Sequence, residues 1–237
     1  MSALTMASAL AAAMTWAGAS LLAHGPAGKL GALTFTRVQL VAAALVLVAM
    51  VTIRGAWATV TWSHWPELTI SGLVGVLLCN LALIACLRRG GPRRCLLLLA
   101  MNAPIAALLG YVLRDETASL QSLAGGAAIV AGVVLAIWYG RKRDATSDGL
   151  KGSPASVLLL GLAAAACHAI GLVAIKPAML AGTDPVAASA LRIAGSAAVI
   201  SLIALWPAKI FRSETPLTPR LVVQTVTPGI LGYVVAT

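Results

Sequence analysis

Seven runs of about 20 mainly apolar residues follow one another along this chain, and no other feature constrains its fold as strongly. A helix of about 20 apolar residues crosses the hydrocarbon core of a bilayer, so each run predicts one transmembrane helix. The runs are continuously apolar and do not alternate with polar residues, which argues against a β-barrel. They lie at residues 4–23, 32–53, 68–87, 95–113, 118–138, 155–175 and 187–206.

The composition supports the same fold class. Of the 237 residues, 60% are hydrophobic and 10% are charged, whereas about 25% are charged in a soluble domain. We therefore expect an all-α, polytopic membrane protein, located in a cell membrane of the bacterial inner-membrane type. The net charge of +10 does not indicate a nucleic-acid partner, because the basic residues lie in short loops between the apolar runs.

The chain also repeats itself. Arg37 stands just inside the second apolar run, and Arg192 stands just inside the seventh, 155 residues later. The motif Gly72–Leu78 returns as Gly229–Val235, 157 residues later. An internal duplication of this size in a membrane protein is typical of a secondary transporter built from two pseudo-symmetric halves.

The repeat divides the chain into two domains. A first half of five helices covers residues 1–139, a polar linker covers 140–153, and an incomplete second half covers 154–237. The period places Thr237 opposite Asn80, inside the third helix of the first half. Two complete halves would hold ten helices, so we expect about seven and a half here, in a chain truncated at its C-terminus.

Basic residues are distributed unevenly between the two sides of the membrane. With the helices assigned as above, 13 of the 17 lysines and arginines lie on the side opposite the N-terminus. Because cytoplasmic loops collect basic residues, this bias predicts an N-terminus outside the cytoplasm.

Several local motifs occur in the order found in one transporter superfamily. They are the small residues around Trp16 in Thr15–Ser20, Arg37 followed by small and aliphatic residues, Asn102–Glu116 with its helical proline, and the glycines of Gly125–Leu135. In these motifs and in its repetition, the chain resembles the EamA-like members of the drug/metabolite transporter superfamily over essentially its whole length.

The resemblance implies a function and an arrangement. Such proteins export or exchange small metabolites by alternating access, and each half holds five helices. Because five is odd, the two five-helix repeats are inverted relative to each other, which places the substrate site between them near the membrane midplane. The resemblance also implies an N-terminus in the cytoplasm, contrary to the charge bias, so the orientation stays open.

Four residues with charged, titratable or aromatic side chains are candidates for the substrate pathway. Arg37 and Arg192 either anchor their helix ends at the interface or attract an anionic group of the substrate. His168 either titrates near neutral pH and couples transport to protons, or only hydrogen bonds across helices. Trp16, whose place in the second half is taken by His168, either lines the pathway or packs in the core.

Three neutral polar residues complete the predicted pathway: Gln39, Asn80 and Asn102. Amides inside a helix bundle either bind a ligand or tie helices together. None of the seven acidic residues lies in the middle of an apolar run. A transporter that exchanges cations for protons on a membrane-buried carboxylate is therefore not expected.

Two other functions stay open at this point: a membrane-embedded enzyme acting on lipid-linked substrates, and the permease subunit of a multi-component transporter. The three histidines lie far apart, no HExxH or GxSxG motif is present, and the four cysteines lack metal-ligand spacing. We therefore predict a non-enzymatic chain without catalytic residues, metal or cofactor. The expected partners are a small-molecule solute and the lipid bilayer, with a homodimer as an open alternative.

Overall fold

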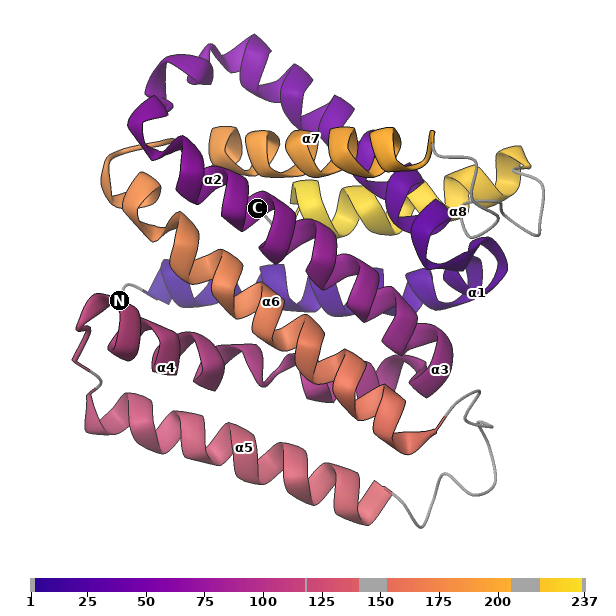
Figure 1. The fold of residues 1–237 in the computed structure, drawn as a ribbon, viewed down its shortest axis with the longest axis vertical. Helices are drawn as coiled ribbons and strands as arrows, with labels where there is room; N and C mark the ends of the chain where they lie inside the picture. Colours follow the sequence, from indigo (N-terminus) through magenta and orange to yellow (C-terminus); the bar gives the residue numbers. More distant parts are fainter. Residues whose placement is uncertain (1–2, 118, 141–152, 206–217, 236–237) are drawn as a thin grey trace.

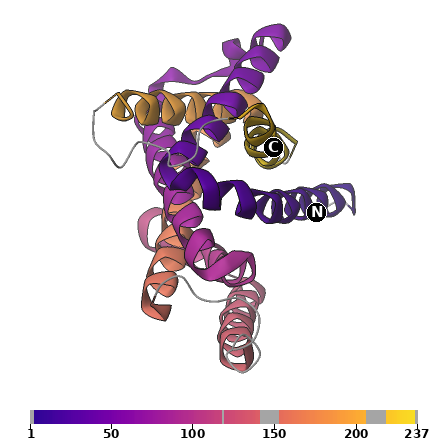
Figure 2. The ribbon, with the colours of Figure 1, turned by 90° about the vertical axis from the view of Figure 1, so that its right-hand side faces the viewer.

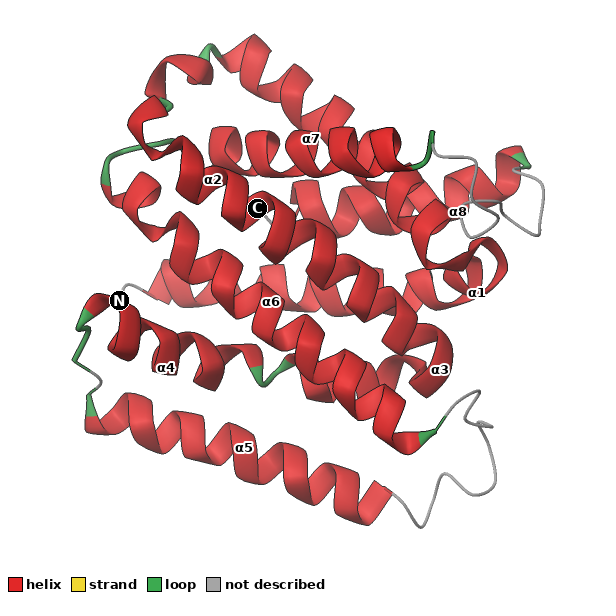
Figure 3. Ribbon diagram, in the orientation of Figure 1, coloured by secondary structure: helices red, strands yellow, loops and turns green. Residues whose placement is uncertain are grey.

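The computed structural model describes residues 3–117, 119–140, 153–205 and 218–235, and every regular element in these ranges is a helix (Figures 1 and 3). The α-helices are α1 (Ala3–Arg54), α2 (Trp65–Gly72), α3 (Cys79–Leu99), α4 (Asn102–Arg114), α5 (Leu120–Gly140), α6 (Pro154–Leu180), α7 (Pro185–Ile203) and α8 (Pro219–Ile230). Short 3-10 helices, Ala56–Thr59 and Trp62–His64, connect α1 to α2, and π-helical segments occupy Leu73–Leu78 and Leu231–Val235. Of the predicted linker at 140–153, only the two end residues are described.

Six of the seven predicted transmembrane runs lie mainly within a continuous helical stretch, whereas the run at 95–113 is divided between α3 and α4 by the turn at residues 100–101. Within the described ranges, the helical stretches long and apolar enough to cross a membrane are Leu10–Arg54, Trp62–Leu99, Leu120–Tyr139, Pro154–Leu180 and Pro185–Ile203. The first two are 45 and 38 residues long, because each contains residues of two predicted runs. α8 begins the expected eighth span. The prediction of an all-α, multi-pass membrane bundle is therefore confirmed.

Two glycines divide the two longest continuous helical stretches. Gly31 in α1 has a φ of 78° and Gly91 in α3 has a φ of 73°, a backbone region that side chains with a Cβ rarely adopt. At each glycine the chain leaves one helix and starts the next without an intervening loop. α1 therefore consists of a first arm (residues 3–30) and a second arm (residues 32–54), which correspond to the first two predicted runs.

The start of α7 is set by local signals in the sequence. Pro185 occupies the first helical position, where its missing N–H is not needed. The Asp184 carboxylate caps the helix by accepting hydrogen bonds from the backbone N–H groups of Val186 (2.9 Å) and Ala187 (3.0 Å). This cap fixes how far along α7, and therefore how deep in the bundle, Arg192 lies.

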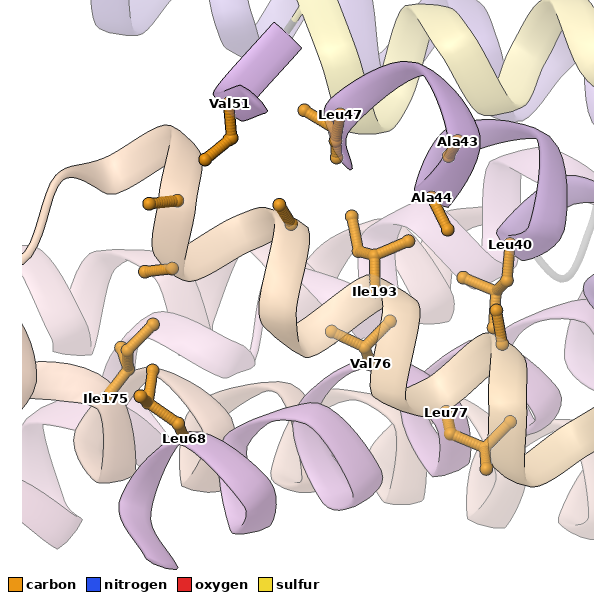
Figure 4. Close-up of a cluster of buried hydrophobic side chains, with 14 of the residues drawn as sticks. Leu40, Ala43, Ala44, Leu47, Val51, Leu68, Val76, Leu77, Ile175 and Ile193 are labelled. Carbon is orange, nitrogen blue, oxygen red and sulfur yellow. The ribbon is translucent and has the colours of Figure 1, made fainter. Parts of the chain in front are cut away.

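Two clusters of buried side chains hold the helices together. In the first, shown in Figure 4, Leu40 and Leu47 from the second arm of α1 pack with Ile193 of α7 and Val76 of the first π segment. The second cluster joins α1, α3 and α6 and includes Phe35, which is completely buried. Apart from α4, which carries Asn102, the helices that carry the candidate residues therefore contribute to these two cores.

α5 lies apart from these cores, at one end of the molecule in both Figure 1 and Figure 2. Only 6% of the residues in its apolar window are buried inside the chain. Large apolar side chains such as Trp138, which is 75% exposed, face outward from it. An apolar helix with this much exposed surface is suited to contact with lipid, and it contributes nothing to the candidate site.

Candidate functional site

The helices α2–α3, α6 and α7 approach one another through a glycine contact. A Cβ added to Gly75 in the first π segment would lie 2.5 Å from the Cα of Gly171 in α6, so only glycines permit this distance. The hydroxyl of Ser71 donates a hydrogen bond to the Gly171 carbonyl (2.5 Å), and that of Ser196 in α7 donates to the Gly72 carbonyl (2.9 Å). Small residues and interhelical hydrogen bonds of this kind join helices inside membranes.

The duplicated motif has the same backbone form in both halves. Leu73–Leu78 and Leu231–Val235 are both π-helical, a rare conformation that often marks functional positions. Gly75 of the first segment packs on the first helix of the second half, α6. Its counterpart Gly232 packs on the first helix of the first half, where a Cβ would meet the Trp16 ring at 3.4 Å. In each half, the glycine of the π segment therefore packs on the first helix of the other half.

A central cavity of about 440 Å³ lies between these two contacts. Its volume is within the range of roughly 300–1,000 Å³ that small-molecule sites occupy. It is bounded by the first arm of α1, the two π segments, α3, α6 and α7, and so by both halves of the chain. The residues that line it are Ala12, Ala13, Trp16, Gly75, Val76, Cys79, Asn80, Leu83, His168, Ser189, Ile193, Gly232 and Tyr233.

Three rings gather at this cavity. The Trp16 ring lies 6.5 Å from the His168 ring and 5.5 Å from the Tyr233 ring, with the tyrosine edge-to-face at 88°. His168 and Gly75 lie in the same cavity wall. Trp16 and His168, which the repeat equates in the sequence, are therefore neighbours at the cavity. Aromatic rings offer apolar area, and the tyrosine and histidine add polar groups to it.

Two of the predicted amides form a pair beside the cavity. The Asn80 Nδ2 atom donates a hydrogen bond to the Gln39 Oε1 atom (3.3 Å), and both side chains are buried. Asn80 lines the central cavity and also an adjoining hollow of about 30 Å³, which Gln39 lines as well. Each amide therefore ties two helices together and also presents polar atoms to these spaces.

Arg192 of α7 lies beside Gly75, one of the residues in the wall of the central cavity, without itself lining the cavity. It lies seven residues after Pro185, about 10 Å along the helix axis. Its Nη2 atom is 3.5 Å from the position of a Cβ on Gly75, and its Nε atom is buried without a hydrogen-bond partner. Its charge also interacts with Cys79 and Tyr233, both of which line the cavity.

The structure does not bring the other two predicted residues to this place. Arg37 is half-buried on the second arm of α1, and Asn102 begins α4 after the turn at residues 100–101. Neither lines the central cavity or the adjoining hollow. Of the seven predicted pathway residues, Trp16, Gln39, Asn80 and His168 line these two spaces and Arg192 lies beside Gly75 of the cavity wall, whereas Arg37 and Asn102 do neither.

A comparison with known families adds to this geometry. The family model described as the EamA-like transporter family matches residues 3–138, more than half of the 237 residues. The chain belongs to the EamA-like transporter family. The predicted resemblance is thereby confirmed, and this multi-pass membrane protein is a transporter of small solutes. Searches of curated proteins and of solved structures gave no match.

The family match extends over only part of the candidate site in this EamA-like transporter. Trp16, Gln39 and Asn80 lie inside the matched residues, whereas His168 and Arg192 lie beyond them. The place of these two residues in the site rests on the internal repeat and on the geometry of the cavity.

Sequence reasoning missed several residues of the cavity. Cys79 lies one helical turn after Gly75, and Ser189 lies three residues before Arg192. Residues three or four positions apart share a helix face, so a search around the predicted residues at this spacing would have found both.

Proposed function

We propose that this EamA-like transporter carries a small organic solute through the central cavity by alternating access of its two halves, in export or exchange. The main observation in support is that one cavity of about 440 Å³ is bordered by equivalent elements of both halves. These elements are the first helix and the π segment of each half. In transporters with inverted repeats, the substrate site lies at the interface of the repeats, formed by interrupted helices.

The lining supports specific roles. Trp16 and Tyr233 would contact the apolar part of the solute, and Asn80 would hydrogen bond to a polar group on it. His168 is the proposed site of proton coupling, because it is the titratable ring in the wall of the cavity. The solute is the proposed partner, and the homodimer stays a prediction that cross-linking in the membrane would check.

Transport by reconstituted vesicles tests the proposal. The chain is inserted into lipid vesicles, and uptake and efflux of radiolabelled amino acids, organic acids and nucleosides are measured with and without a pH gradient. The Trp16→Ala variant should lose at least about tenfold in rate for any solute that moves, because it removes a cavity wall. Trp138→Ala is the matched control, since Trp138 is 75% exposed on α5.

Two results would contradict the proposal. One is that no solute crosses faster than in empty vesicles at any pH gradient. The other is that the two tryptophan variants transport equally well. For the proton-coupling role, a His168→Ala variant that keeps full pH-dependent transport would remove His168 from the mechanism, while leaving the transport function intact.

A further inference from the structure

The most unusual chemical feature beside the site is a half-buried arginine, Arg192, whose Nε atom is buried without a hydrogen-bond partner among the described residues. The Arg192 guanidinium lies among α7, α6 and the first π segment, with its Nε atom buried and unpaired. Among the described residues, no carboxylate forms an ion pair with it; Glu67 pairs with His64 (3.4 Å) and Glu116 with Lys176 (2.6 Å). An ionised group in a membrane interior is costly unless an opposite charge or strong hydrogen-bond acceptors meet it.

The other half of the chain has no such charge at the equivalent place. A Cβ on Gly72 would meet the Arg192 carbonyl oxygen at 3.0 Å. The repeat partner of Gly72 is Gly229, and a Cβ there would meet the Gln39 carbonyl oxygen at 3.3 Å. Gln39, rather than Arg37, is therefore the spatial counterpart of Arg192. Gln39 is uncharged, and its side chain accepts a hydrogen bond from Asn80. The positive charge next to the cavity wall therefore comes from the second half only.

A location at the membrane interface does not account for the arginine. Arg192 lines an outer hollow of about 190 Å³ that reaches Trp62 and Trp65, where a snorkelling side chain would end. The Nη2 atom instead lies next to Gly75, which lines the central cavity. The end of the Arg192 side chain therefore lies against a residue of the central cavity wall and not at the two tryptophans of the outer hollow.

We propose that Arg192 binds the carboxylate of the transported solute, and that the substrates are small organic monoanions with an apolar or aromatic body. This proposal rests on the proposed transport function. A planar guanidinium pairs with a carboxylate through two parallel hydrogen bonds. The residues that line the cavity include no Asp, Glu, Lys or Arg, so the Arg192 guanidinium beside Gly75 supplies one positive charge at this wall for one negative charge. A phosphate, with up to two charges, would be less well neutralised.

The charge of the cavity can be measured without knowing the solute. A thiol is introduced by Ser189→Cys, one turn before Arg192 on the same cavity wall. The membrane-inserted chain reacts with the anionic sulfonatoethyl and the cationic trimethylammonioethyl methanethiosulfonates, and mass spectrometry of the peptide gives each rate. The denatured chain gives the intrinsic ratio of the two rates.

The ratio of the anionic to the cationic labelling rate should be higher in the membrane-inserted chain than in the denatured chain. Arg192→Gln should reduce this ratio by at least about tenfold, because one nearby positive charge is removed. Arg37→Gln is the matched control and should leave the ratio unchanged, since the neighbours of Gly75 in the cavity wall include Arg192 and not Arg37. Equal effects of the two variants, or no effect of Arg192→Gln, would overturn the proposal. If Arg192→Gln does not fold, a ratio at or below the intrinsic one in the Ser189→Cys chain overturns it.

Protection experiments then test the ligand class with three probes: sodium benzoate, benzamide and inorganic phosphate. Benzoate should slow labelling of the introduced thiol at concentrations at least about tenfold lower than benzamide, which has the same shape without the charge. Arg192→Lys should keep the reagent preference and lose most of the benzoate selectivity, because an ammonium does not pair through two parallel bonds. Better protection by phosphate or by benzamide than by benzoate would refute a carboxylate site. These readouts do not depend on transport, so a failed vesicle assay and a failed anion site give different results.

Discussion

The contact between Gly75 and Gly171 leads to a prediction with a magnitude that the structure sets. An alanine Cβ at Gly75 would lie 2.5 Å from the Gly171 Cα, whereas ordinary contact begins at 3.4 Å. The first π segment and α6 must therefore separate by about 0.9 Å, the difference of these distances. That shift would lengthen the 2.5 Å hydrogen bond from Ser71 to the Gly171 carbonyl to about 3.4 Å, beyond good geometry.

The expected loss of stability combines three effects. Overpacking costs about 1–3 kcal/mol, and a weakened interhelical hydrogen bond in a membrane protein costs about 1 kcal/mol. Alanine gains back about 1 kcal/mol over glycine through its helix propensity. Gly75→Ala should therefore lower the free energy of unfolding by about 1–3 kcal/mol, read from an SDS titration of the chain in mixed micelles.

Gly125→Ala in α5 is the matched control for this prediction. A Cβ there meets nothing within 4 Å, so only the gain in helix propensity should remain. Gly171→Ala should destabilise as much as Gly75→Ala, since it is the same contact from the other side. The double variant should cost less than the sum, because helices already separated accept the second methyl more easily. Equal unfolding midpoints for Gly75→Ala and Gly125→Ala would refute the close-contact argument.

The remaining predictions concern turns, caps and a polar pair. Gly31→Ala should cost about 1–2 kcal/mol because Gly31 has a φ of 78°, whereas Gly28→Ala, with nothing within 4 Å, should not destabilise the chain; thermal unfolding in detergent compares the two. Asp184→Ala should cost about 1 kcal/mol by the same assay and Asp184→Asn much less, since the amide oxygen still caps α7; equal losses would contradict the capping role. A double-mutant cycle of Asn80→Ala and Gln39→Ala should give a coupling of about 1 kcal/mol, and a coupling near zero would show that their 3.3 Å contact is not a stabilising bond.

The features that could be predicted from the sequence are those that depend on residues close together in the chain. Continuous apolar runs predicted the helices, because the length that crosses a bilayer is a property of each segment alone. The repeated motif around Gly72 and Gly229 pointed to the positions where both π segments form. The equivalence of Trp16 and His168 in the repeat likewise anticipated two rings that are neighbours at one cavity.

The pairing of polar residues between the halves could not be predicted in the same way. Matching identical residues pairs Arg37 with Arg192 at a spacing of 155, whereas the glycine contacts pair Gln39 with Arg192 at a spacing of 153. Spacing changes along a duplicated chain whenever a connection gains or loses residues. A difference of two residues on a helix is about 200° of rotation, and it decides whether a side chain faces the cavity.

Asn102 shows a second limit of sequence reasoning. An amide in an apolar run looks like a pathway residue, since polar groups in a membrane are costly and usually have a role. Here the helix breaks at residues 100–101, and Asn102 starts α4, outside both spaces of the site. At a helix start, backbone groups are unpaired in any case, and polar residues are common there. The break, which depends on tertiary packing, removes the reason to assign Asn102 to the pathway.

The two halves therefore share a scaffold but differ in charge at one equivalent position. Each half contains a π segment and a glycine that packs on the first helix of the other half, so the backbone around the cavity has the same form on both sides. At the equivalent side chains, Gln39 is satisfied by Asn80, whereas the Nε atom of Arg192 has no hydrogen-bond partner. A ligand can favour one conformation only through contacts that differ between the states. In this chain, the contact best able to differ is the one with Arg192, because an unpaired buried charge gains most from an arriving carboxylate. Binding of an anion would thus act mainly through α7 and the first π segment, and the neutral half would serve as the surface against which they move.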